Sequence, residues 1–255
     1  MSVSIGLVGS TDHAVLRELA PRIEAAGFAA LWLNESGGAD SLGGLAVAAE
    51  VTTMLGLGSG VIPLDRRDAA QVAASVLALG LPQHRLSVGV GSGGPHDALR
   101  RVGDAVDRLH ADLTAPVFVG ALGPRMRRLG AERADGILLN WLDPASAAAA
   151  TAQLRADSGG APRRSVLYVR TALDDAARPA LEAEADRYGR IPSYAANLAL
   201  LGIAPMDTTI DGIASLAPRL AEFSAAVDEV VLRVVTAGSS RAELLAFVDA
   251  AVAAL

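Results

Sequence analysis

Short apolar runs alternate with stretches of helical periodicity along the chain. Eight runs are rich in β-branched and other apolar residues: Ser4–Ser10, Ala30–Glu35, Met54–Ile62, Arg85–Gly93, Pro116–Leu122, Gly136–Trp141, Ser165–Leu173 and Glu229–Thr236. Several are apolar at consecutive positions, as parallel strands that are covered on both faces require. The pattern therefore predicts eight parallel strands.

The stretches between these runs have the three- and four-residue spacing of amphipathic helices. The clearest stripe lies between the fourth and fifth runs and consists of Leu99, Val102, Val106, Leu109 and Leu113. Capping residues precede the first, second and last stripes, at Asp12, at Asp40 or Ser41, and at Ser239 or Ser240. Eight strands, each followed by a helix, predict one (β/α)8 TIM-barrel domain over residues 1–255. The longest connection, before the last strand, has room for a helix, a break at Gly189–Pro192, an extra turn near Pro205 and a further helix over Asp211–Ala226.

The amino-acid composition excludes several catalytic mechanisms. The chain has no cysteine and no lysine, so all 22 basic residues are arginines. This excludes a lysine Schiff base, a cysteine nucleophile and a zinc–cysteine or Fe–S centre. The net charge of −6 argues against nucleic acid as a partner, and no apolar run has the length of a membrane span. We expect a cytoplasmic protein that acts on a small molecule and has neither a membrane nor a nucleic-acid partner.

Few side chains are suitable for general acid–base catalysis. Glu35, at the end of the second strand, is the first candidate for a proton donor, and His96, after the fourth strand, is the second. Each has a structural alternative: Glu35 pairs with an arginine or caps a loop, and His96 is a surface histidine at a helix start. No His-x-His or His-Glu-x-x-His pattern exists, so we expect no metal.

Glycine is frequent where strands end, and these ends form the active site of a TIM barrel. In Leu55–Pro63 and Val88–Gly94 it indicates a bulge or the close approach of a ligand, or else a strand thinned to pack against helices. After the fifth strand, Gly123 and Pro124 open a helix beside Arg125. The free amides of that helix start make a candidate phosphate site, unless Gly123 only forms a tight turn.

These glycine-rich ends resemble the bacterial luciferase-like superfamily, which contains flavin monooxygenases and oxidoreductases that use coenzyme F420. The resemblance extends over the whole chain and is most specific in Leu55–Arg67, Gln83–Gly93 and Pro116–Trp141. The stretch from Phe118 to Met126, followed by Leu138-Leu139-Asn140-Trp141, is similar to F420-dependent reductases.

The resemblance implies a luciferase-like barrel, a homodimer, and coenzyme F420, or alternatively FMN, across the strand ends. Relatives hold a non-prolyl cis peptide at the place of Gly60–Val61. The cofactor-binding residues implied are Ser59, Gly60, Val61, Gly91, Ser92, Gly120, Ala121, Leu122, Gly123, Arg125 and Asn140.

Three departures from the family narrow the expected reaction. No histidine follows the second strand, Ser92-Gly93 stands where relatives have a carboxylate, and the usual insertion between the fourth and fifth strands is absent. We expect an oxidoreductase that moves a hydride between the cofactor and a small organic substrate. One alternative is a barrel that binds a flavin, F420 or a partner without turnover. Another is a non-redox barrel that binds a sugar phosphate near Thr236–Ser240.

Overall fold

The computed structural model describes residues 2–35, 38–94 and 96–254. Within these residues, eight parallel strands pair in the order β6-β5-β4-β3-β2-β1-β9-β7, and pairing of β7 with β6 closes the barrel. The strands are β1 Ser2–Val8, β2 Ala30–Asn34, β3 Gly56–Pro63, β4 Leu86–Gly91, β5 Val117–Gly120, β6 Gly136–Asn140, β7 Arg164–Ala172 and β9 Glu229–Val234. The predicted TIM barrel is confirmed.

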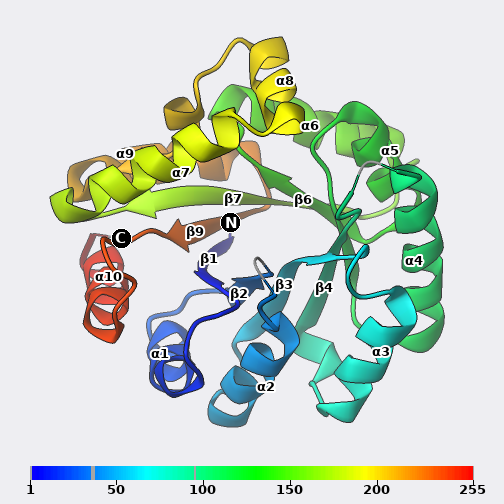
Figure 1. Ribbon diagram of the computed structural model, residues 1–255, viewed down its shortest axis with the longest axis horizontal. Helices are drawn as coiled ribbons and strands as arrows, with labels where there is room; N and C mark the ends of the chain where they lie inside the picture. Colours follow the sequence, from blue (N-terminus) through cyan, green and yellow to red (C-terminus); the bar gives the residue numbers. More distant parts are fainter. Residues whose placement is uncertain (1, 36–37, 95, 255) are drawn as a thin grey trace.

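Helices surround the strands on the outside (Figure 1). They are α1 His13–Ala25, α2 Ser41–Val51, α3 Ala69–Ala78, α4 Ala98–Asp112, α5 Pro124–Arg133, α6 Pro144–Asp157, α7 Arg178–Gly189, α8 Pro192–Leu201, α9 Ile213–Ala226 and α10 Arg241–Ala254. Asp12 caps α1, as its sequence predicts, because its carboxylate accepts from the amide of Ala14. None of the helices in the described residues is long and apolar enough to cross a membrane.

The connection between β7 and β9 contains the break and the further helix that the sequence predicts. It also contains two elements that the sequence does not predict: the helix α8 after the break, and β8, the short strand Ile210–Asp211, which pairs with the end of β7. Two residues are too few to produce a recognisable period. The connection between β4 and β5 contains α4 as its one helix in the described residues.

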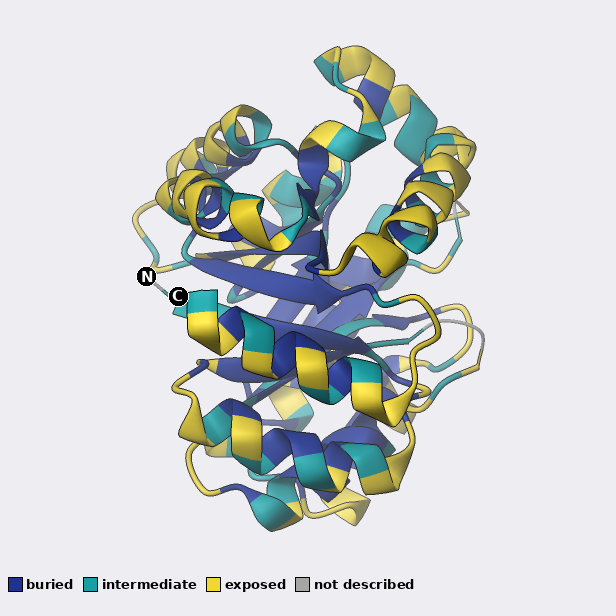
Figure 2. Cartoon of the chain, turned by 90° about the vertical axis from the view of Figure 1, so that its left-hand side faces the viewer, coloured by how far each residue is buried: buried dark blue, intermediate teal, exposed yellow. Residues whose placement is uncertain are grey.

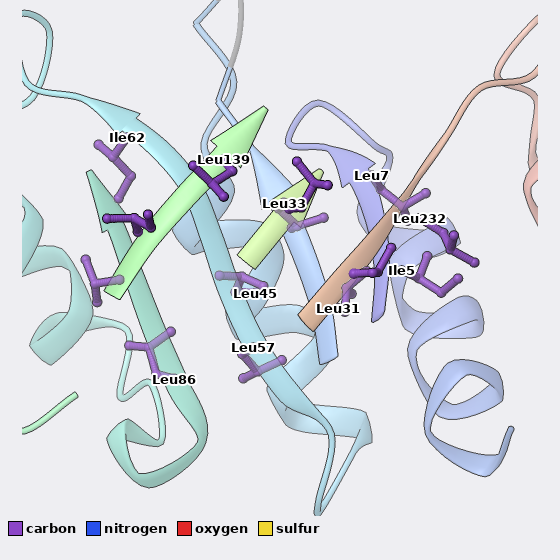
Figure 3. Packing of buried hydrophobic residues seen from close by; sticks show 14 of the residues in the cluster. Ile5, Leu7, Leu31, Leu33, Leu45, Leu57, Ile62, Leu86, Leu139 and Leu232 are labelled. Atoms are coloured by element: carbon purple, nitrogen blue, oxygen red, sulfur yellow. The ribbon is translucent and has the colours of Figure 1, made fainter. Parts of the chain in front are cut away.

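Alternate side chains of each strand point outward and form the main core against the helices. Figure 2 shows the strands as a buried layer beneath helices that are exposed on their outer faces. Figure 3 shows part of this packing, in which Leu31 and Leu33 of β2 and Leu57 of β3 lie near Leu45 of α2. Because both the outside and the inside of the barrel are covered, the strands have the near-continuous apolar sequences that predicted them.

A second cluster fills the barrel interior and joins Trp32, Phe118 and Tyr168 with smaller side chains. Trp32 packs edge-on against both other rings, at centroid distances of 6.0 and 6.1 Å. Glycines on other strands make room for them, since a methyl group at Gly58 would lie 2.2 Å from the Trp32 ring. The glycine-rich β3 is therefore thinned for packing, as one alternative predicts, but against interior aromatic rings and not against the helices.

Candidate active site

The ends of β3, β4 and β5 meet around Val61. A methyl group at Gly91 would lie 2.8 Å from one Val61 methyl carbon, and one at Gly120 would lie 2.9 Å from the other. The β3–β4 register shifts between Ser59 and Ile62, and the Gly60–Val61 peptide is cis, as the resemblance implies. The structure thus places Gly60, Val61, Gly91 and Gly120, all implied in cofactor binding, next to one another.

Two serines of the implied site are engaged with the protein itself. The Ser59 hydroxyl is buried and accepts a 3.0 Å hydrogen bond from the amide of Gly89, which ties β3 to β4 at the register shift. The carbonyl of Ser92 accepts a 2.7 Å hydrogen bond from Arg101 of α4. These contacts fix the strand ends in position, and cofactor binding by Ser59 and Ser92 stays a prediction.

The turn from β5 into α5 leaves the start of the helix open. Gly123 is the N-cap residue, and no side chain of the described residues caps the amides that follow. A methyl group at Gly123 would have no neighbour within 4 Å, and Arg125 is exposed. Ala121 and Leu122 are less free: the Ala121 amide donates to the Leu138 carbonyl, and the Leu122 carbonyl accepts from Arg127.

Two buried arginines lie at the same level of the barrel. Arg170 of β7 and Arg233 of β9 are paired in the strand register, and they are only 5% and 9% exposed. Arg170 Nε donates to Oε1 of Glu184 at 3.1 Å, whereas Arg233 Nη2 is 4.0 Å from Oε2 of the same carboxylate. Burial and the neighbouring Arg170 lower the pKa of Arg233, against the opposing effect of Glu184.

Asparagines and aromatic rings complete this cluster. Arg233 Nε donates to Asn34 Oδ1 at 3.1 Å, and Arg170 donates to Asn140 Oδ1. The guanidinium of Arg170 also lies 4.3 Å from the centroid of the Trp141 ring and 4.9 Å from that of Tyr188. Among the implied cofactor residues that the structure describes, Asn140 is the one hydrogen-bonded to the arginine cluster, and its oxygen is already occupied by Arg170.

Arg170 and Arg233 lie at the ends of predicted strands but are not among the site residues predicted from the sequence, and neither is Glu184. A signal for the arginines was present, because each is a charged residue near the end of an otherwise apolar strand sequence, and arginine is almost never buried without a partner. No comparable signal marks Glu184, which occupies one position among several acidic residues on α7.

The two candidate acid–base residues are not brought together. Oε1 of Glu35 accepts hydrogen bonds from the amide and the hydroxyl of Ser41, at 3.2 and 2.9 Å, and lies 3.5 Å from Arg67. Glu35 therefore both caps α2 and pairs with an arginine. His96 is exposed in the β4–α4 loop. Their roles as proton donors stay predictions.

Comparison with known proteins now adds to this geometry. The family profile described as luciferase-like monooxygenase matches residues 5–114 and 107–254. The chain belongs to this family. No curated protein sequence matches it.

Solved structures of luciferase-like enzymes share the fold. A coenzyme F420 dependent tetrahydromethanopterin reductase from Methanopyrus kandleri has a TM-score of 0.68 at 16% identity, over 96% of this chain and 97% of that one. An F420-dependent secondary alcohol dehydrogenase in complex with an F420-acetone adduct has 0.75 at 14%, over 100% and 98%. The oxygenating constituent of the 3,6-diketocamphane monooxygenase of Pseudomonas putida, in complex with FMN, has 0.69 at 12%, over 98% and 97%.

The loop after β9 of this luciferase-like protein gives no support to a sugar-phosphate site near Thr236–Ser240. The carboxylate of Glu243 accepts from the amides of Gly238 and Ser240 at 2.9 and 2.8 Å, and the amide of Ser239 donates to Thr236 Oγ1. Hydrogen bonds from Ser240 and Gly238 lower the pKa of Glu243. The amides that would hold a phosphate here are thus occupied by an internal carboxylate.

Two surface grooves lie outside the predicted site. One, of about 400 Å³, lies between α3 and α4, and the other, of about 390 Å³, lies between α5, α6 and α8. No residue implied in cofactor binding lines either groove. The described residues also contain no cluster of three or more side chains that could hold a metal ion.

Proposed function

We propose that this luciferase-like protein is an oxidoreductase that binds coenzyme F420, or alternatively FMN, and moves a hydride between it and a small organic substrate. The observation that carries the proposal is the open, uncapped start of α5 at Gly123, three residues after the end of β5 at Gly120. Membership of the luciferase-like family supports a flavin-type cofactor.

The residues present fit such a cofactor in two respects. First, the amides that open α5, together with Arg125, can receive a phosphate, because a helix N-terminus offers free donors and a partial positive charge. Second, Gly91 and Gly120 have no side chains, so the strand ends beside Val61 present mainly backbone to a flat ring system. Val61 lies so close to both glycines that a methyl group at either position would clash with it.

The protein would contribute binding and exclusion of water more than acid–base chemistry. The cofactor, when bound, would supply the hydride donor or acceptor atom. Trp141, Tyr188 and the buried arginines would close the side of the site formed by β6, β7 and β9. Glu35 remains the first candidate for a proton donor and His96 the second, although Glu35 also has the structural contacts described above.

Titration of the purified protein with candidate cofactors tests whether it binds F420 or FMN. F420, FMN and riboflavin are each added to the protein, and binding is followed by fluorescence of the cofactor. We expect micromolar or tighter binding of F420 or FMN and weaker binding of riboflavin, which has no phosphate. No affinity for either phosphorylated cofactor would overturn the proposal.

A second candidate function is cofactor binding without turnover. It is favoured by the engagement of Glu35 with Ser41 and Arg67, which holds the first candidate proton donor in structural contacts. The two functions are separated by turnover: reduction or oxidation of any member of a broad panel of unsaturated and carbonyl substrates supports the oxidoreductase, whereas tight binding without turnover supports the second candidate.

A further inference from the structure

The arginine cluster carries more positive charge than the protein neutralises. Arg170 and Arg233 occupy one level of neighbouring strands, where like charges repel. Glu184 is the one carboxylate within 4.0 Å of either guanidinium among the described residues. The buried group therefore has a net charge of +1, which is unfavourable unless an anion is nearby.

Hydrogen bonding is incomplete at the same place. Glu184 accepts a hydrogen bond from Arg170 but stands 4.0 Å from Arg233 Nη2, beyond hydrogen-bond distance. Arg233 uses Nε on Asn34 and Nη1 on the carbonyl of Val234. Nη2 is thus the side of Arg233 that lacks a hydrogen-bonded partner among the described residues.

Two further buried groups nearby have no hydrogen-bond partner. Trp141 is 1% exposed and stacks on Arg170, and its Nε1 has no acceptor in the described residues. The hydroxyl of Tyr168, two positions before Arg170 on β7, is also buried and unpaired. Unpaired buried donors are uncommon in folded proteins, and an acceptor oxygen placed beside the arginines would satisfy the Trp141 donor.

We propose that Arg233 and Arg170 bind the carboxylate of an organic monoacid. The inference rests on the proposed function in one respect, since it names the substrate class of the same site. An oxygen of the carboxylate would accept from Nη2 of Arg233, and guanidinium groups recognise carboxylates with directional, charge-assisted hydrogen bonds.

Charge and surroundings select a monoacid over a phosphate group. One negative charge balances the net +1 of the cluster, whereas a phosphate dianion would leave an excess negative charge in a buried place. The rings of Trp141 and Tyr188, which lie 4.3 and 4.9 Å from the Arg170 guanidinium, suit an apolar or aromatic body attached to the carboxylate. Benzoate is therefore a suitable probe, and benzamide is its neutral counterpart of similar shape.

The test uses the protein without cofactor, so that it is independent of flavin or F420 binding. Calorimetric titrations compare benzoate, benzamide and inorganic phosphate at constant ionic strength and pH 7.5. We expect saturable binding of benzoate, at least about tenfold tighter than that of benzamide, as one charge-assisted hydrogen bond implies. Benzoate binding no tighter than benzamide, or phosphate binding that is tighter than benzoate and is lost in Arg233→Met, would overturn the proposal.

Substitutions in and outside the arginine cluster test where benzoate binds. Arg233→Met should weaken benzoate binding about tenfold or more. Arg190→Gln removes an arginine whose side chain is 80% exposed, and it should leave benzoate binding unchanged. Glu184→Gln should tighten benzoate binding, because it raises the positive charge of the cluster. Equal benzoate affinity in wild type and Arg233→Met, or weaker binding in Glu184→Gln, would contradict the assignment. Failure of the cofactor titration alone would overturn the proposed function and leave this result standing.

Discussion

The indole Nε1 of Trp32 donates a 2.6 Å hydrogen bond to Oε1 of Glu229 inside the barrel. The same oxygen accepts from the Ser4 hydroxyl, also at 2.6 Å, and Oε2 accepts from Arg164 at 2.6 Å. Glu229 is 3% exposed. One carboxylate therefore satisfies three donors on β1, β2 and β7, and joins these strands to β9.

The variant Glu229→Gln should destabilise the fold. It keeps an oxygen for Trp32 and Ser4 but places an amide N–H against Arg164. We expect a loss of about 1–3 kcal/mol in the free energy of unfolding, below that of a fully buried pair because Arg164 is half exposed. Urea denaturation measures it. The double variant with Arg164→Leu should lose less than the sum of the single losses, and additive losses would show that the two residues are not coupled.

Gly60 and Tyr168 give a second pair for a double-mutant cycle. A methyl group at Gly60 would lie 2.2 Å from the Tyr168 hydroxyl oxygen and 2.8 Å from its ring carbon. Gly60→Ala should therefore lower the thermal midpoint by several degrees. Tyr168→Phe alone should have little effect, since the hydroxyl it removes has no partner. The double variant should recover part of the loss, and a double variant less stable than Gly60→Ala would contradict this packing.

The stability of the protein should depend on the ionisation of Glu184. Burial raises the pKa of this carboxyl group, but Arg170 and Arg233 lower it by a larger amount. The pKa therefore lies below the ordinary value of 4.5. A depressed pKa contributes stability that is present above pH 4.5 and is lost as the pH falls through the folded-state value.

Thermal midpoints measured from pH 7 to pH 3 test this dependence. Glu184→Gln should be less stable than wild type at pH 7, because it leaves two buried arginines without a carboxylate, and the difference should shrink on acidification. Glu182→Gln, on the same helix with a side chain 53% exposed, is the matched control. A difference between wild type and Glu184→Gln that stays constant with pH would argue against the predicted ionisation.

The start of α5 should bind cofactor without contributing to stability. Gly123→Ala should change the unfolding free energy by less than about 0.5 kcal/mol, because the added methyl group meets no neighbour. It should nevertheless weaken binding of the phosphorylated cofactor, because the methyl group obstructs the amides. Arg125→Gln should weaken it too, and more at low salt than at high salt. Arg128→Gln, on the same helix and with a side chain that is 63% exposed, should leave cofactor binding unchanged. Unchanged cofactor affinity in Gly123→Ala would place the phosphate elsewhere.

Much of the fold could be predicted because its signals are local. The run Gly136–Trp141 contains β6, and Glu229–Thr236 contains β9, with boundaries that differ by one or two residues. The differences occur where residues leave the ladder but remain buried, as Trp141 does. Burial sets the apolar pattern, whereas hydrogen bonding sets the end of a strand.

The candidate site could be predicted only in part. Glycines at strand ends locate the floor around Val61, because backbone close to a neighbour demands glycine wherever that neighbour comes from. The pairing of Arg170 with Glu184 depends on how α7 crosses the barrel, which no local spacing encodes. Glu35, by contrast, makes the contacts that its structural alternative predicts, with Ser41 six positions later and with Arg67.

The positions of the two tryptophans make the protein its own optical reporter. Trp32 is held within the barrel by Glu229, while Trp141 lies 4.3 Å from the guanidinium of Arg170. Their emission should therefore separate into one signal that follows unfolding and one that follows events at the strand ends. Replacing Trp32 by phenylalanine would leave a single fluorophore beside the arginine cluster, with which ligand arrival could be timed in a stopped-flow instrument without any added dye.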